Sequence, residues 1–238
     1  MVDHSESRPA DRLRPVEFLL DYQKSPTGSV LASFGSTRVI CAVSVSEGVP
    51  PWMRSEGKTG GWITAEYRMM PGSTEPRQSR KESGRSTEIQ RLIGRSLRAA
   101  IDLEKLPGLT VTVDCDVLDA DGGTRCASIT GASVALELAF RRLLQSGRIA
   151  ENPMKARVAA VSVGMVGGRA LLDLCYEEDS AADVDMNVVM TDGGRFVEVQ
   201  GSGEESTFSR AEMDGMLELA VRGINRFFDC QRQVLASR

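Results

Sequence analysis

The feature that most constrains the fold of this chain is a strand pattern that runs, through a two-glycine loop, directly into a long apolar helix pattern. Residues 109–121 read LTVTVDCDVLDAD, in which apolar and polar side chains alternate as in a half-buried strand. The loop Gly122-Gly123-Thr124-Arg125 follows, and beyond it apolar side chains recur at helical spacing as far as Leu144. Gly147 then stands where glycine commonly ends a helix.

The rest of the chain repeats this mixture of strands and helices. Alternating side chains predict a hairpin over residues 28–49 with its turn at Gly35-Ser36. Capping boxes at Thr87 with Gln90 and at Ser209 with Glu212 mark two further helices. The remaining strands are expected over residues 61–71, 158–166, 169–178, 183–191 and 194–202. This pattern predicts an α+β fold, an α/β sandwich, in which each half has a β-rich part followed by a helix.

Length and composition limit the organisation and the function classes. The 238 residues are interpreted as a single domain, 1–238, with residues 1–14 as a mobile tail. The one histidine, His4, falls in that tail, which argues against Ser-His-Asp and Cys-His catalysis. No apolar run is long enough to predict a membrane span or a signal peptide. Five cysteines without a Cys-x-x-Cys pair indicate reduced thiols, as in the cytoplasm.

The loop before the second helix has the residues of an anion site. The first N–H groups of a helix are unpaired and carry partial positive charge, and glycines allow close backbone approach. Thr124 supplies a hydroxyl donor, and Arg125 supplies a guanidinium that can fork onto a phosphate. These residues predict a phosphate site, although a tight turn with a surface arginine would explain them as well.

A second arginine and an acidic pair extend this hypothesis. Arg85 lies just before the predicted helix that Thr87 caps, where it could hold the same anion from the other side; a solvated arginine is the alternative. Asp179 and Asp185 flank an expected hairpin turn, across which they could bind Mg²⁺ or serve as an acid. A soluble acidic turn is the plainer explanation.

Local charge points to a polyanion partner. Residues 68–98 hold eight basic and three acidic side chains in a chain whose net charge is −4. A phosphate site, a carboxylate pair and a basic region together favour phosphoryl transfer to or from nucleic acid. An attacking inorganic phosphate would need no histidine base, because its second ionisation falls near neutral pH.

Four sequence blocks closely resemble the bacterial ribonuclease PH family, and the resemblance covers nearly the whole chain. The blocks read SGRSTEIQRLIGRSLRAA, LDADGGTRCASITGA, NPMKARVAAVSVGMV and EDSAADVDMNVVMT. The resemblance implies a ribosomal protein S5 domain 2-like fold with two β/α repeats. It also implies a phosphate-dependent 3′→5′ exoribonuclease that trims tRNA precursors, releases nucleoside diphosphates and runs in reverse. Members form hexamers, built as trimers of dimers.

The same resemblance assigns site residues. It implies that Arg85, Gly123, Thr124 and Arg125 bind phosphate, and that Asp179 and Asp185 bind Mg²⁺ or act in catalysis. Arg68, Arg77 and Arg80 fall in the region that resembles the tRNA-contacting loop of the family. Cys126 is expected to be a packing residue. Three alternatives remain: a non-catalytic RNA-binding subunit of an exosome-like ring, an mRNA-degrading phosphorylase, and an S5-like RNA-binding module.

Overall fold

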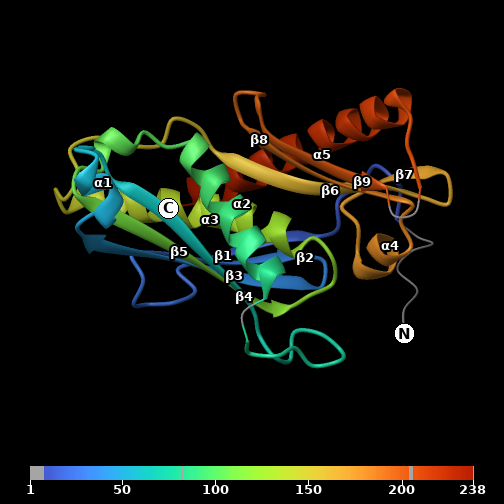
Figure 1. Ribbon diagram of the computed structural model, residues 1–238, viewed down its shortest axis with the longest axis horizontal. Coiled ribbons are helices and arrows are strands. Elements are labelled where there is room, and N and C mark those ends of the chain that lie inside the picture. Colours follow the sequence, from blue (N-terminus) through green and yellow to red (C-terminus); the bar gives the residue numbers. More distant parts are fainter. Residues whose placement is uncertain (1–7, 82, 204–205, 238) are drawn as a thin grey trace.

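The computed structural model describes residues 8–81, 83–203 and 206–237, which form two β-sheets and their covering helices (Figure 1). The strands are β1 (Val16–Leu20), β2 (Gly28–Phe34), β3 (Thr37–Glu47), β4 (Trp62–Met69), β5 (Leu109–Asp119), β6 (Val158–Val166), β7 (Arg169–Leu172), β8 (Val184–Thr191) and β9 (Phe196–Gly203). The helices are α1 (Pro51–Ser55), α2 (Gly84–Ala99), the 3₁₀ turn η1 (Leu103–Lys105), α3 (Thr124–Gln145), α4 (Tyr176–Ser180) and α5 (Arg210–Ala236).

The two sheets correspond to the two halves of the chain. The first sheet has the order β1-β2-β3-β5-β4, in which β4 and β5 are parallel and the other neighbours antiparallel. The second is an antiparallel sheet of order β7-β6-β8-β9. Along β5 the apolar residues alternate as expected, so that Val111, Val113 and Cys115 are buried while their neighbours are partly exposed.

Helix α3 lies between the sheets, packed on β2 and β3 on one side and on β6 on the other. Its sequence is suited to this place because small residues allow both sheets to come close. A Cβ at Gly131 would lie 2.8 Å from the Cβ of Ala32 and 2.9 Å from the sulfur of Cys41. Every residue from Cys126 to Phe140 is buried, so the core anchors this helix from its third residue, directly after Thr124 and Arg125.

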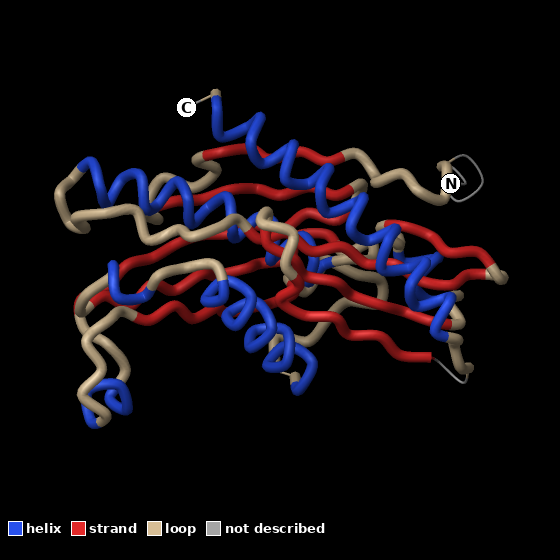
Figure 2. Tube along the Cα trace, turned by 90° about the horizontal axis from the view of Figure 1, so that it is seen from above, coloured by secondary structure: helices blue, strands red, loops and turns tan. Residues whose placement is uncertain are grey.

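Helices α2 and α5 complete the core. Helix α2 packs on β4 and α3, and α5 packs along β6 and β7. Figure 2 shows α5, which ends at the label C, running diagonally across the strands. The rings of Phe34 in β2 and Phe227 in α5 stack with centroids 4.5 Å apart, which joins the halves in one continuous apolar core.

The structure confirms the predicted α+β class, the hairpin turn after Phe34, the helix end at Gly147 and the capping box of Ser209 with Glu212. The capping box at Thr87 is wrong, because Ser83 caps α2 four residues earlier and accepts a hydrogen bond from the N–H of Ser86. No described helix is both long and apolar enough to cross a membrane.

Two other expectations need correction. The strand predicted over residues 169–178 stops at Leu172, since the backbone of Asp173 turns to a φ of +58° and Cys175 and Glu178 form a capping box that begins α4. The tail predicted through residue 14 is held at its end, because Arg8 donates to the carbonyl of Leu172 and Arg14 is buried. Residues 1–7, with His4, lie outside the described residues.

Candidate active site

A cavity of about 830 Å³ gathers most of the residues singled out from the sequence. It lies where the end of β5, the start of α2, the start of α3 and helix α4 meet. Its lining includes Arg85, the segment from Gly122 to Arg125, Asp179 and Asp185. The residues predicted to bind phosphate and the predicted acidic pair therefore share one cavity, although Arg85 and Asp185 are 100 positions apart in the sequence.

The glycine loop is shaped by packing beneath it. Both glycines have left-handed backbones, with φ of +72° at Gly122 and +66° at Gly123, and Gly123 is the N-cap of α3. A Cβ on Gly122 would lie 2.5 Å from the carbonyl oxygen of Leu174, and one on Gly123 would lie 2.9 Å from Arg14 Nη2. The space that a side chain would need is thus filled by the protein, and the glycines let the loop seat on α4 and Arg14.

The Gly122→Ala variant should be much less stable than the wild type. Its methyl group would meet backbone atoms that cannot move aside, in addition to the strain of a positive φ. We expect a loss of about 2–4 kcal/mol in the free energy of unfolding. Gly147→Ala is the matched control, because its φ is +70° and nothing lies within 4 Å of the added carbon. Equal losses of stability in the two variants, measured by denaturant unfolding, would contradict this account of Gly122.

The two arginines face the cavity from different helices. Arg85 is the second residue of α2, in its first turn rather than before it, and Arg125 is the second residue of α3. Nη1 of Arg125 donates to Oε1 of Gln200 at 3.3 Å, which orients the guanidinium. Within the described residues, no carboxylate lies within ion-pair distance of Arg85 or Arg125. Two cationic groups without a described carboxylate at ion-pair distance favour binding of an anion between them.

The hydroxyl of Thr124 is positioned by a buried tyrosine. Tyr67 is only 2% exposed, and its hydroxyl lies 2.8 Å from Oγ1 of Thr124. When Tyr67 is the donor in this bond, Thr124 keeps its own hydrogen for an anion in the cavity. Burial raises the pKa of Tyr67, more than its bond to Thr124 and the nearby Arg85 and Arg125 lower it. Tyr67 therefore stays protonated and able to donate.

The acidic pair lines the same cavity as the loop. Asp179 lies in helix α4 and Asp185 in strand β8, so the hairpin expected between them is a helix followed by a strand. Both side chains line the same cavity, as their predicted proximity requires. Burial, and then the like charge of Asp179, raise the pKa of Asp185 to about 6. Arg125 and a hydrogen bond from Asn187 oppose this shift without cancelling it.

The raised pKa of Asp185 has a consequence for stability. Between the ordinary carboxyl pKa of about 4 and the folded value near 6, the folded protein binds more protons than the unfolded chain, so its stability falls as pH rises through this range. In EDTA, Asp185→Asn should therefore raise the free energy of unfolding by about 1–2 kcal/mol above pH 6, after allowance for solvent screening, and have little effect below pH 4. The exposed Asp183→Asn is the control; a pH-independent difference at Asp185 would refute this cause.

Asn187 links Asp185 to the start of α3. Its Nδ2 donates to Oδ2 of Asp185 at 3.2 Å, and its Oδ1 accepts from the thiol of Cys126 at 3.4 Å. The thiol thus fixes which way the amide points. Burial raises the pKa of Cys126 far above its ordinary value. It is therefore a neutral packing residue, in agreement with the prediction.

The carboxylate pair fits a divalent cation that takes its remaining ligands from water and from a phosphate. The donors are hard oxygens, and a cation between them would relieve the repulsion by Asp179, which adds to burial in raising the pKa of Asp185. Among the described residues, no group of three or more His, Cys, Asp or Glu side chains could hold a metal ion. Two carboxylates suit Mg²⁺, which keeps waters and takes further ligands from substrate phosphates.

Two of the three arginines predicted to contact RNA line the cavity, and the third lies outside the lining. Arg68, on β4, and Arg80, in the segment before α2, line the cavity with Lys81. Arg77 is exposed on the same segment but is not part of the lining. The basic segment therefore borders the mouth of the cavity, as a track for a polyanion would.

Several residues that shape the site were not predicted. They are Arg14, Thr37, Tyr67, Asp173, Asn187 and Gln200. Each is a single polar residue in or beside a strand, and each acts on a segment far away in the sequence. No local spacing marks them, and the one available signal is that Asp173 and Asn187 are polar residues in otherwise apolar runs.

Comparison with known proteins relates the chain to RNA-degrading enzymes. Residues 12–141 match the 3′ exoribonuclease family, domain 1, and residues 156–223 match its domain 2. Ribonuclease PH of Bacillus subtilis is 54% identical over 236 residues, which is 97% of this chain and 96% of that protein. The crystal structure of rice Rrp46 has a TM-score of 0.80 at 20% identity, with 97% of this chain and 99% of that one covered.

A second solved structure shows the same fold. The Archaeoglobus fulgidus exosome with RNA bound to the active site has a TM-score of 0.79 at 23% identity. The match covers 93% of this chain and 90% of that one. The two sheets and their helices are therefore an arrangement that this chain shares with exosome proteins.

Proposed function

The chain belongs to the 3′ exoribonuclease family, and from this premise we propose that the cavity described above is its phosphorolytic centre. The enzyme is a phosphate-dependent 3′→5′ exoribonuclease and nucleotidyltransferase, as the resemblance to the ribonuclease PH family predicted. The observation that carries the proposal is the convergence of Arg85, Thr124, Arg125, Asp179 and Asp185 on one cavity beside a basic segment.

The arrangement suits attack by inorganic phosphate. Arg85 and Arg125 hold the anion by charge, while the first N–H groups of α3 and the hydroxyl of Thr124 orient it. One phosphate oxygen attacks the phosphorus of the last phosphodiester bond, and the bond from that phosphorus to the 3′-oxygen of the preceding nucleotide breaks. The products are a nucleoside diphosphate and an RNA shorter by one residue. The same geometry serves the reverse reaction, which adds nucleotides from diphosphates.

The leaving 3′-oxygen needs a proton. Asp185, whose pKa of about 6 leaves it partly protonated near neutral pH, is suited to supply that proton. Asp179 and Asp185 could alternatively hold Mg²⁺, which would offset negative charge on the reacting phosphates. Asp185 would then be an unprotonated ligand, and the leaving oxygen would take its proton from elsewhere. Asn187 orients the Asp185 carboxyl group through its hydrogen bond.

RNA is the substrate, and we extend this to tRNA precursors. Arg68 and Arg80 at the cavity, with Arg77 further along the segment, would contact the phosphates of the acceptor stem, and a hexamer would bring several such segments together. Exposed apolar side chains at Phe196 and Val199 on β9 are consistent with burial between subunits. All five cysteines are free, as expected of a cytoplasmic protein.

A tRNA with a few extra 3′ nucleotides tests the proposal. Purified protein and Mg²⁺ are incubated with it, with and without inorganic phosphate, and the released mononucleotide is identified. We expect nucleoside diphosphates only when phosphate is present. Release of monophosphates without phosphate would indicate hydrolysis. Absence of release would favour the alternative of a non-catalytic ring subunit.

A further inference from the structure

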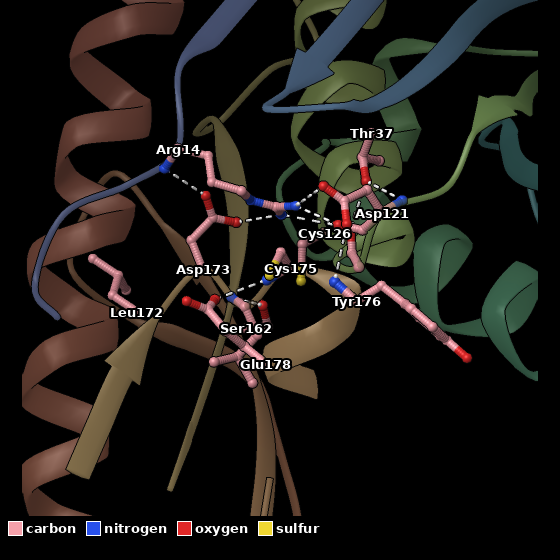
Figure 3. Close-up of polar contacts among 12 residues, drawn as sticks. Arg14, Thr37, Asp121, Cys126, Ser162, Leu172, Asp173, Cys175, Tyr176 and Glu178 are labelled. Carbon is pink, nitrogen blue, oxygen red and sulfur yellow. Dashed lines mark hydrogen bonds and ion pairs between the residues drawn. The ribbon is translucent and has the colours of Figure 1, made fainter. Parts of the chain in front are cut away.

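A buried ion pair lies directly beneath the glycine loop. Arg14, in the segment before β1, and Asp173, between β7 and α4, are 7% and 1% exposed. Nη2 of Arg14 lies 2.7 Å from Oδ1 of Asp173, whose other oxygen accepts from the N–H of Arg14 at 2.9 Å (Figure 3). Burial lowers the pKa of Arg14, but the charges of Asp173 and Asp121 outweigh it and hold that pKa above its ordinary value. Arg14 is therefore always charged.

Arg14 also forms hydrogen bonds to the backbone of the glycine loop. Its Nη1 donates to the carbonyl of Asp121, and its Nη2 lies 3.5 Å from the carbonyl of Gly122. Thr37 forms hydrogen bonds to the same segment: its hydroxyl donates to the carbonyl of Gly122 at 2.7 Å and accepts from the N–H of Asp121 at 2.8 Å. Figure 3 shows Arg14 reaching from the Asp173 side to this loop.

The direction of these carbonyls fixes the direction of the next amides. In a planar trans peptide the N–H points opposite to the C=O. The carbonyls of Asp121 and Gly122 point at Arg14 and Thr37, so the N–H groups of Gly122 and Gly123 point away from them. Both glycines line the cavity. The buried side chains beneath the loop thus decide how its donors face an anion above it.

We propose that Arg14 and Asp173 are a positioning pair for the co-substrate phosphate, acting through the backbone of residues 121–123. This proposal rests on the proposed function of the cavity. The pair spans the two halves of the chain, and the same segment reaches α4, because Oδ1 of Asp121 accepts from the N–H of Tyr176 at 3.1 Å. The loop that binds phosphate and the helix that carries Asp179 are therefore held in one network.

Arg14→Lys tests the proposal, because lysine keeps the charge beside Asp173 but cannot fork onto both carbonyls. We expect the phosphate KM to rise about tenfold or more, while the RNA KM stays within about twofold of wild type. The thermal stabilisation given by inorganic phosphate should shrink in parallel, without any need for turnover. Arg38→Lys is the matched control, because Arg38 pairs with Asp119 at the entrance to the same segment but is 53% exposed.

The two KM values and kcat of Arg14→Lys together support or overturn the positioning role. An unchanged phosphate KM would overturn the proposal, and so would an equal rise in both KM values or a fall in kcat alone, since these indicate general structural support. If Arg14→Lys does not fold, Asp173→Asn is judged by the same criteria, because asparagine tolerates the left-handed backbone at φ +58°. If wild type releases no diphosphate, the proposed function fails, and the phosphate-induced thermal shift still tests the pair.

Discussion

Asp185→Asn should lower kcat by about 100-fold or more and leave the affinity for RNA within about twofold of wild type. The asparagine amide has almost the same shape as the carboxyl group, so the cavity and its basic border stay in place. What is lost is a group that can hold a proton near neutral pH or bind a cation together with Asp179. Phosphorolysis of a fluorescent oligoribonucleotide in saturating phosphate gives kcat, and a binding assay without phosphate gives RNA affinity.

Asp183→Asn is the control for this variant. It makes the same chemical change two residues earlier, at an exposed position that is not part of the cavity lining. We expect its kcat to equal that of wild type. Turnover by Asp185→Asn at the wild-type rate in Mg²⁺ would rule out both roles of Asp185, as acid and as ligand. A matching loss of RNA affinity would move its role from the chemical step to substrate binding.

Arg125→Ala should raise the KM for phosphate about tenfold or more, which is the scale of one lost charge-assisted contact. Arg125 stands in the first turn of α3, and its guanidinium is oriented by Gln200. Its removal takes away charge and a fork of donors without disturbing the core. Initial rates at varied phosphate and fixed RNA measure the effect.

Arg125→Lys and Arg91→Ala are the comparisons for this variant. Lysine restores the charge without the fork, so its phosphate KM should lie between those of wild type and alanine. Arg91 is exposed on α2 outside the cavity lining, and its loss should change little. An unchanged phosphate KM in Arg125→Ala would contradict the assignment of the loop, and a raised RNA KM alone would make Arg125 an RNA contact.

The sequence predicted those parts of the site that lie within one continuous segment. The strand β5, the two glycines and the start of α3 follow from alternation, turn residues and helical spacing, which act between neighbours in sequence. It predicted a strand and a hairpin turn where Asp179 lies in helix α4. The alternation of residues 169–178 indicated a strand, and the capping box of Cys175 and Glu178 was not recognised. Cysteine is not a residue from which a cap is inferred, although here it serves as one.

The parts that escaped prediction depend on contacts between distant segments. Arg14 and Asp173 are 159 positions apart, and nothing near either residue marks the other. The role predicted for Gly122 and Gly123 also needs correction, because contacts with distant segments determine it. The sequence suggested that they make room for the anion, whereas the structure shows Leu174 and Arg14 occupying the space of their missing side chains. Glycine permits the left-handed backbone of this loop, and packing against Leu174 and Arg14 selects it.

The most direct test of the central claim follows the oxygen atoms of phosphate. RNA is incubated with the enzyme, Mg²⁺ and inorganic phosphate in which every oxygen is ¹⁸O, and the released nucleotide is analysed by mass spectrometry. Attack by phosphate held between Arg85 and Arg125 predicts a nucleoside diphosphate that retains all the labelled oxygens, one of them in the bridge between its two phosphorus atoms. A nucleoside monophosphate without label would mean that water is the nucleophile, and would contradict the account of the cavity as a phosphorolytic centre.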